Sequence, residues 1–208
     1  MFNEIKENYL ISEMYIVDDE RSGTVETWLP NLYPEATNEL NEYMKAVSEN
    51  DDRLADNYKD INYFNFPFVT TVKRNNKIIE CGTGYICDVY PKNCIRVMNR
   101  YYRAPASRPL ITTEYARPSK VAVIEQQLEM VKRLNGEIAI ITRDRAKRHL
   151  TKFANALTEK SDYTWKVSND KCLVTTNHNN PRAWQYIAYT KLKNIDYDFL
   201  KHWQTRQE

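Results

Sequence analysis

The spacing of apolar side chains divides the chain into helical and extended segments. In residues 35–49, 118–134 and 145–160, apolar side chains recur every three or four positions, which predicts helices with one buried face. Pro118 suits the first turn of the second helix, and Gly136 suits its C-terminal cap. Each helix therefore needs a partner layer to cover its apolar face.

Between the first two helices, residues 66–103 are rich in Tyr, Phe, Val, Ile and Thr and are interrupted by short turns. An Asn-Asn pair forms the first turn, because asparagine tolerates a positive φ in a two-residue hairpin. A Pro-Lys-Asn turn follows. The pattern predicts three consecutive antiparallel strands, at residues 66–74, 77–90 and 93–103.

Residues 137–144, with the sequence EIAIITRD, form a short and almost continuously apolar run that is typical of a central strand. A strand, a long helix and a further strand imply a right-handed crossover and a locally parallel pair. Residues 163–176 predict one or two more strands, and residues 181–194 predict a helix opened by Pro181. The order predicts an α/β fold: a mixed, mostly antiparallel sheet with flanking helices.

Charge is unevenly distributed, although the net charge of the chain is only +2. Residues 1–70 contain fifteen Asp or Glu and five Lys or Arg, a net −10, and residues 71–208 carry the balancing +12. Either the acidic part covers the basic part, or a basic surface faces an anionic partner. Both interpretations remain open.

The cysteines and the N-terminus indicate the cellular setting. Cys81, Cys87, Cys94 and Cys172 form no C-x-x-C pair and have no histidine near them, which predicts free thiols and no zinc site. The N-terminus has neither a basic start nor an apolar core, so we expect no signal peptide, and no apolar run is long enough to span a membrane. A cytoplasmic protein is expected.

A basic stretch without glycine, residues 100–120, joins a predicted strand to the second helix. Arg117 and Lys120 lie in the first turn of that helix, where positive charge opposes the helix dipole unless an anion lies between them. Arg103 and Arg108 could reach the same point. The alternative is a solvated loop whose arginines pair with the acidic N-terminal segment.

The order of elements in residues 66–176 resembles the GCN5-related N-acetyltransferase (GNAT) fold. In that family, the loop before the long helix holds the pyrophosphate of the cofactor through backbone amides of an Arg/Gln-x-x-Gly-x-Gly/Ala motif. The loop at residues 106–120, ASRPLITTEYARPSK, occupies this place but contains no glycine. The ending RAWQYIAYTKL is similar to small, uncharacterised GNAT-like proteins of tailed phages, in which case the compartment would be the host cytoplasm.

The resemblance implies acetyl-CoA or another acyl-CoA as cofactor and a phosphate-bearing small molecule as partner. It assigns the phosphates to long side chains in place of glycine amides: Arg103, Arg108, Arg117, Ser119 and Lys120. The family places a tyrosine general acid about seven residues after its fifth strand, and here Leu150 or Thr151 stands there. The domain prediction is a single GNAT-like domain over residues 1–208, with residues 1–60 as an acidic helical segment.

Residues 177–189 bring aromatic side chains close together and supply two candidates for proton transfer, Tyr186 and Tyr189. They could line a cleft, with an aromatic wall for an adenine or another base. The alternative is that Trp184, Ile187 and Ala188 belong to the core and the tyrosines to its rim.

A second basic cluster, in residues 142–152, could follow a nucleic-acid backbone, or it could be an ordinary solvated helix face. Three functions therefore remain open. The first is an acyltransferase that moves an acyl group from a coenzyme A thioester to an amine. The others are a GNAT-derived enzyme of a phage that modifies nucleic acid, and a non-catalytic binding or structural module of the same fold.

Overall fold

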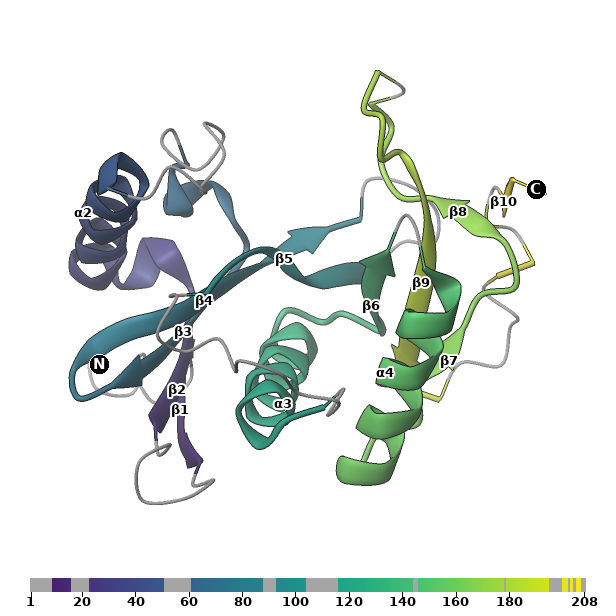
Figure 1. Ribbon diagram of the computed structural model, residues 1–208, viewed down its shortest axis with the longest axis horizontal. Coiled ribbons are helices and arrows are strands. Elements are labelled where there is room, and N and C mark those ends of the chain that lie inside the picture. Colours follow the sequence, from purple (N-terminus) through teal and green to yellow (C-terminus); the bar gives the residue numbers. More distant parts are fainter. Residues whose placement is uncertain are drawn as a thin grey trace.

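A computed structural model describes residues 9–15, 23–50, 61–87, 93–103, 116–143, 146–177, 179–194, 200–201, 203 and 205–206. Its centre is a long, twisted sheet with helices on both faces (Figure 1). Neighbouring strands follow the order β1-β2-β3-β4-β5-β6-β9-β8-β10, and β7 also pairs with β9. The strands are β1 (Leu10–Tyr15), β2 (Gly23–Trp28), β3 (Val69–Arg74), β4 (Lys77–Ile86), β5 (Cys94–Arg103), β6 (Ile138–Arg143), β7 (Lys166–Val167), β8 (Lys171–Leu173), β9 (Trp184–Lys191) and β10 (Thr205–Arg206).

Among the described strand pairs, β5 with β6 is the parallel one, and the others are antiparallel. Helix α3 (Pro118–Arg133) makes the crossover between these two strands. The structure therefore confirms the predicted mixed, mostly antiparallel sheet with flanking helices.

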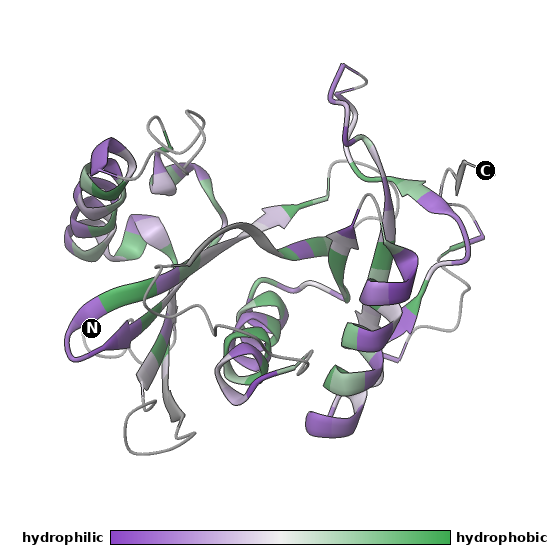
Figure 2. Ribbon diagram, in the orientation of Figure 1, coloured by the Kyte–Doolittle hydropathy of each residue, from purple (hydrophilic) through white to green (hydrophobic). Residues whose placement is uncertain are grey.

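Helices cover the two faces of the sheet separately. Helix α2 (Pro34–Asn50) packs on one face, where Leu40 and Met44 meet Trp28 and Val69. Helix α3 lies on the other face, together with α4 (Lys147–Lys160). Short 3-10 turns lie at Pro30–Leu32 and Tyr63–Asn65. Hydrophilic and hydrophobic bands alternate along α4, as expected for a helix with one covered side (Figure 2).

Asparagines provide the left-handed backbone positions that the turns require. Asn75 and Asn76 have φ values of 49° and 59°, which confirms the predicted hairpin between β3 and β4. At the end of α3 the left-handed residue is Asn135 (φ 58°), whereas Gly136 was expected to provide the cap. Gly136 is needed for close approach instead, because a Cβ there would lie 2.4 Å from a methyl group of Val131.

Two segments differ from the sequence prediction. The helix predicted for residues 181–194 is wrong, because most of this segment is the strand β9. In β9, Tyr186 and Ala188 pack into one core while Ile187 packs into the core on the opposite face, so the strand is covered on both sides. Residues 1–60 are not helical throughout either, since β1 and β2 precede α2.

Buried polar side chains lie under α3. Gln126 donates from Nε2 to the carbonyl of Val25 (2.9 Å) and accepts from the hydroxyl of Thr27 (3.1 Å). The next residue, Gln127, is fully buried, and neither its amide oxygen nor its amide nitrogen has a hydrogen-bond partner in the described part of the chain. Burial of the Gln127 amide therefore costs free energy. For the Gln126 amide, the two hydrogen bonds compensate this cost.

We predict that Gln127→Met stabilises the fold by about 1 kcal/mol, because an apolar side chain of similar length removes the desolvation cost of the amide. The matched substitution Gln126→Met should lower the free energy of unfolding by a similar amount, since it leaves buried groups of β2 without their partner. Urea unfolding of both variants measures the two changes. Equal destabilisation by both substitutions would contradict the assignment.

Candidate functional site

Strands β5 and β6 part soon after they pair. Their parallel register consists of three pairs, Cys94 with Ile138, Ile95 with Ala139 and Arg96 with Ile140. Beyond these pairs β5 continues to residue 103 and β6 continues to residue 143. We call the diverging stretches, residues 97–103 and 141–143, the β5–β6 fork. Among the described residues no pair joins the two strands there, so the facing edges of the fork are not paired with each other.

Strand β5 is irregular on its other side as well. Against β4 its register shifts between Cys81 and Thr83 and again between Thr83 and Tyr85. At each shift β5 takes three steps while β4 takes two, so β5 contains an extra residue twice. Such bulges bend a strand and increase its twist. They explain how β5 can leave β6 while it stays paired with β4.

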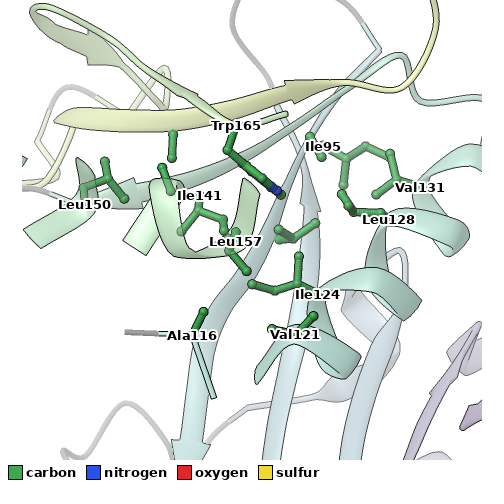
Figure 3. Packing of buried hydrophobic residues seen from close by; sticks show 14 of the residues in the cluster. Ile95, Ala116, Val121, Ile124, Leu128, Val131, Ile141, Leu150, Leu157 and Trp165 are labelled. Carbon is green, nitrogen blue, oxygen red and sulfur yellow. The ribbon is translucent and has the colours of Figure 1, made fainter. Parts of the chain in front are cut away.

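One face of the fork is covered by apolar side chains. Ile95 and Val97 of β5, Ile141 of β6 and Trp165 belong to a single buried cluster with residues of α3 and α4. In Figure 3, Trp165 lies between the two strands and the helices that cover them. Apolar side chains therefore line the fork on this side.

The start of α3 contains the predicted anion site. Arg117 is the N-cap residue but makes no side-chain cap, and the first turn contains no acid. Pro118 has no N–H, and the amides of Lys120 and Val121 both donate to the carbonyl of Arg117 (2.9 Å each). Of the N–H groups of residues 118–121, that of Ser119 is therefore the one without an acceptor among the described residues, and it could donate to a ligand.

Arg117 has an acidic partner within the fold. Its Nη2 lies 3.4 Å from Oε1 of Glu80 in β4, and the Glu80 side chain is only 2% exposed. The register of β4 and β5 also sets Glu80 opposite Arg103. The backbone thus brings positions 103 and 117 to one buried acid, which explains why a basic residue is tolerated at this helix end.

The phosphate-binding residues predicted from the resemblance are only partly placed. Ser119 is buried and Lys120 is half-buried in the first turn of α3. Arg103 lies in β5 near the end of the fork, and Arg108 lies outside the described residues. Their roles in binding stay predictions.

The two tyrosines predicted for proton transfer lie on opposite faces of β9. Tyr186 belongs to the cluster that covers the fork, whereas Tyr189 packs into the core on the other face. Tyr186 pairs with Arg143 at the end of β6. The Nζ atoms of Lys147 and Lys171 lie 5.7 Å and 5.5 Å from the centre of its ring. One site on one face can therefore use only one of the two hydroxyls.

The second basic cluster lies partly on α4. Arg148, His149 and Lys152 are exposed, as is Arg143 at the end of β6. Lys147 donates to the carbonyl of Asn169 (2.7 Å), so it is held against the loop before β8. Binding of nucleic acid by this surface stays a prediction.

The four cysteines are free, as predicted, and three of them are buried. Burial raises the pKa of Cys172 to about 11. Burial also raises the pKa of Cys94 well above its ordinary value, and the neighbouring Cys87 thiol acts in the same direction. These thiols are therefore protonated near neutral pH. Among the described residues, no three His, Cys, Asp or Glu side chains are placed to hold a metal ion.

The described residues can be compared with the needs of a coenzyme A thioester. The free edge of β5 offers backbone groups to an extended arm with amides, and the dry face suits an uncharged acyl group. For phosphate, Ser119 and Lys120 in the first turn of α3 are the predicted residues. The strand edge and the apolar face therefore suit an acyl arm, while phosphate binding by Ser119 and Lys120 stays a prediction.

Comparison with known proteins gave structural matches only, since no protein-family model and no curated protein matches this chain. A ribosomal-protein-S5-alanine acetyltransferase from Vibrio fischeri is 12% identical, with 89% of this chain and 99% of that chain covered and a TM-score of 0.44. A putative acetyltransferase from Salmonella typhimurium with acetyl-CoA is 11% identical, with 78% and 90% covered and a TM-score of 0.42. A CoA-dependent acyl-homoserine lactone synthase is 8% identical, with 81% and 82% covered and a TM-score of 0.49.

Because these TM-scores are below 0.5, the description of the fold rests on the topology. The antiparallel strands β3–β5, the crossover helix α3 and the parallel strand β6 follow the order of elements in which the sequence resembles the GNAT fold. The fold is GNAT-like. Within this GNAT-like fold, sequence reasoning missed Glu80 and Trp165. An acid inside the apolar run KIIEC was the signal for Glu80, while nothing in the sequence distinguishes Trp165 from ordinary core.

None of the helices in the described part of the chain is long and apolar enough to cross a membrane.

We predict that Arg117→Met destabilises the ligand-free protein by roughly 1–3 kcal/mol, because the buried carboxylate of Glu80 loses a charged partner. Adding Glu80→Gln should restore part of this loss. Thermal unfolding without ligand measures the effect, and Arg133→Met, at the exposed end of α3, is the control. An unchanged melting temperature in Arg117→Met would show that the ion pair contributes nothing to stability.

A second prediction concerns the thiols. At pH 8 a thiol with a pKa of about 11 is ionised in on the order of one molecule in a thousand, so Cys172 should resist a thiol-specific reagent in the native state. The half-buried Cys87 should react first. Since the unfolded thiol ionises near pH 9 and the folded one near 11, stability should fall as the pH rises between these values. Mass spectrometry of labelled peptides identifies the sites; rapid native labelling of Cys172 would contradict the assignment.

Proposed function

We propose that this protein transfers an acyl group from a coenzyme A thioester to an amine. The β5–β6 fork supports the proposal. Two neighbouring parallel strands that part after three pairs leave an opening in the middle of a sheet, where continuous pairing would otherwise be expected. A bent β5 with two bulges indicates that the opening belongs to the fold and is not a frayed end.

The fork can position an extended ligand. The edge of β5 that faces β6 has hydrogen-bonding groups free for amides of a bound arm, as in the addition of a strand to a sheet edge. The coenzyme A thioester would supply the activated acyl group. The protein would supply orientation and a dry environment, since the cluster around Ile141 and Trp165 excludes water from one side of the fork.

We propose Tyr186 as the residue that transfers a proton at this site. It lies opposite Arg143, which ends the shorter arm of the fork, and it belongs to the same buried cluster as Ile141. The ammonium groups of Lys147 and Lys171 lie close to its ring and hold it at the end of the fork by cation–π contacts. Tyr189 faces the opposite core and is proposed as a structural residue.

Titration calorimetry with acetyl-CoA tests the proposal. Binding is expected below millimolar concentration, and free coenzyme A should bind as well, since it carries the same arm. Absence of binding of both at millimolar concentration would overturn the proposed function. A panel of amines, with release of free coenzyme A as the signal, then identifies the acceptor class.

We predict that Tyr186→Phe lowers kcat by on the order of a hundredfold, as expected for the loss of a general acid, and changes the KM for acetyl-CoA little. Tyr189→Phe is the matched control in the same strand and should keep kcat within about twofold. Equal losses in both variants would indicate a structural effect of β9. An unchanged kcat in Tyr186→Phe would remove this residue from the mechanism.

A further inference from the structure

Three tryptophans are buried to nearly the same extent: Trp28 is 3% exposed, and Trp165 and Trp203 are each 4% exposed. The indole N–H of Trp28 donates to the hydroxyl of Thr37 (3.0 Å), and that of Trp203 donates to the carbonyl of Leu173 (2.6 Å). The indole N–H of Trp165 has no partner in the described part of the chain. Buried tryptophans normally pair this group, as the other two do.

The position of Trp165 connects this unpaired donor with the fork. Its ring belongs to the cluster that contains Ile95 and Val97 of β5 and Ile141 of β6, the residues at which the strands pair and then part. In Figure 3, the nitrogen end of the indole points into the interior of the cluster, toward the side on which Ile95 and Leu128 lie. The donor is therefore directed inward and away from solvent.

The surroundings limit what the donor can bind. The other buried members of the cluster are apolar side chains, apart from Tyr186, whose ring lies near the ammonium groups of Lys147 and Lys171. A carboxylate or phosphate at this N–H would lose its hydration in surroundings that are mostly apolar. A neutral carbonyl oxygen needs one donor and little hydration, so it is the class of acceptor that this place suits.

We propose that the indole N–H of Trp165 donates a hydrogen bond to a neutral carbonyl oxygen of a ligand at the β5–β6 fork. The proposal rests on the proposed function, in which this oxygen is the carbonyl of the acyl thioester. Trp165 then contacts the reacting group and selects acylated over free coenzyme A. It also closes the fork on the side of α4, where Leu150 and Leu157 pack, and so restricts the length of the acyl group.

Affinity measurements on two variants test the role of the donor. Trp165→Phe keeps an aromatic ring in the cluster and removes the N–H. It should bind acetyl-CoA roughly tenfold more weakly than the unaltered protein, while its affinity for free coenzyme A, which has no acyl carbonyl, stays the same. Trp203→Phe removes an equally buried indole that already has a partner, and it should change neither affinity. Loss of affinity for both ligands, or for neither, in Trp165→Phe would overturn the proposal.

Indole nitrogen–proton NMR signals separate failure of this proposal from failure of the proposed function. The Phe variants assign the signals, and that of Trp165 should shift on addition of acetyl-CoA. If acetyl-CoA does not bind at all, the proposed function fails, and acetamide serves as a minimal carbonyl probe of the same site. A shift of the Trp165 signal alone with acetamide would support a carbonyl site for another ligand. Signals that respond to neither probe would overturn the proposal.

Discussion

Ten of the sixteen residues of α3 are buried, so this helix is enclosed on more than one side. Ala122 and Val123 pack against β2 and β3, while Ile124 and Leu128 join the cluster around the fork. The β2–β3 part of the sheet and the fork at its centre therefore share one helix as their cover. A helix enclosed in this way must bury some of its polar residues, and α3 does so with Gln126 and Gln127 side by side. The fold tolerates an opening between β5 and β6 because α3 holds both strands from the same face.

The fork and its surroundings combine two kinds of environment. Toward α4 the fork is dry and apolar, with one inward-directed N–H group on Trp165. Toward the start of α3 it approaches the buried ion pair of Arg117 and Glu80. A ligand with an uncharged end and a charged end matches this order. The charges at the start of α3 already compensate one another in part, so a bound anion would add to an existing network and not create one.

The sequence was most informative where one local requirement decides the structure. The Asn-Asn turn, the buried stripe of α3 and the apolar run of β6 were all predicted, because positive φ, helical spacing and double coverage leave few alternatives. It was misleading for β9, since an apolar run with Pro181 before it fits a helix or a doubly covered strand equally well. The partner of Arg117 depends on a contact across 37 positions, and the unpaired state of Trp165 depends on several elements together. The acid in the apolar run KIIEC marks Glu80 as unusual, but local patterns identify neither its contact with Arg117 nor the unpaired state of Trp165.

Both ends of α3 are fastened to the chain around α4. Lys160, the last residue of α4, donates to the carbonyl of Ala116 just before α3 begins (2.7 Å). Near the other end of α3, the ammonium of Lys132 lies 5.0 Å from the centre of the Tyr163 ring, and its hydrogen bond with Tyr163 raises the pKa of Lys132. Two contacts therefore connect α3 and the residue before it with α4 and the turn that follows α4. Because Ala116 directly precedes the N-cap residue Arg117, a displacement of α4 would also move the start of α3, where Arg117 meets Glu80.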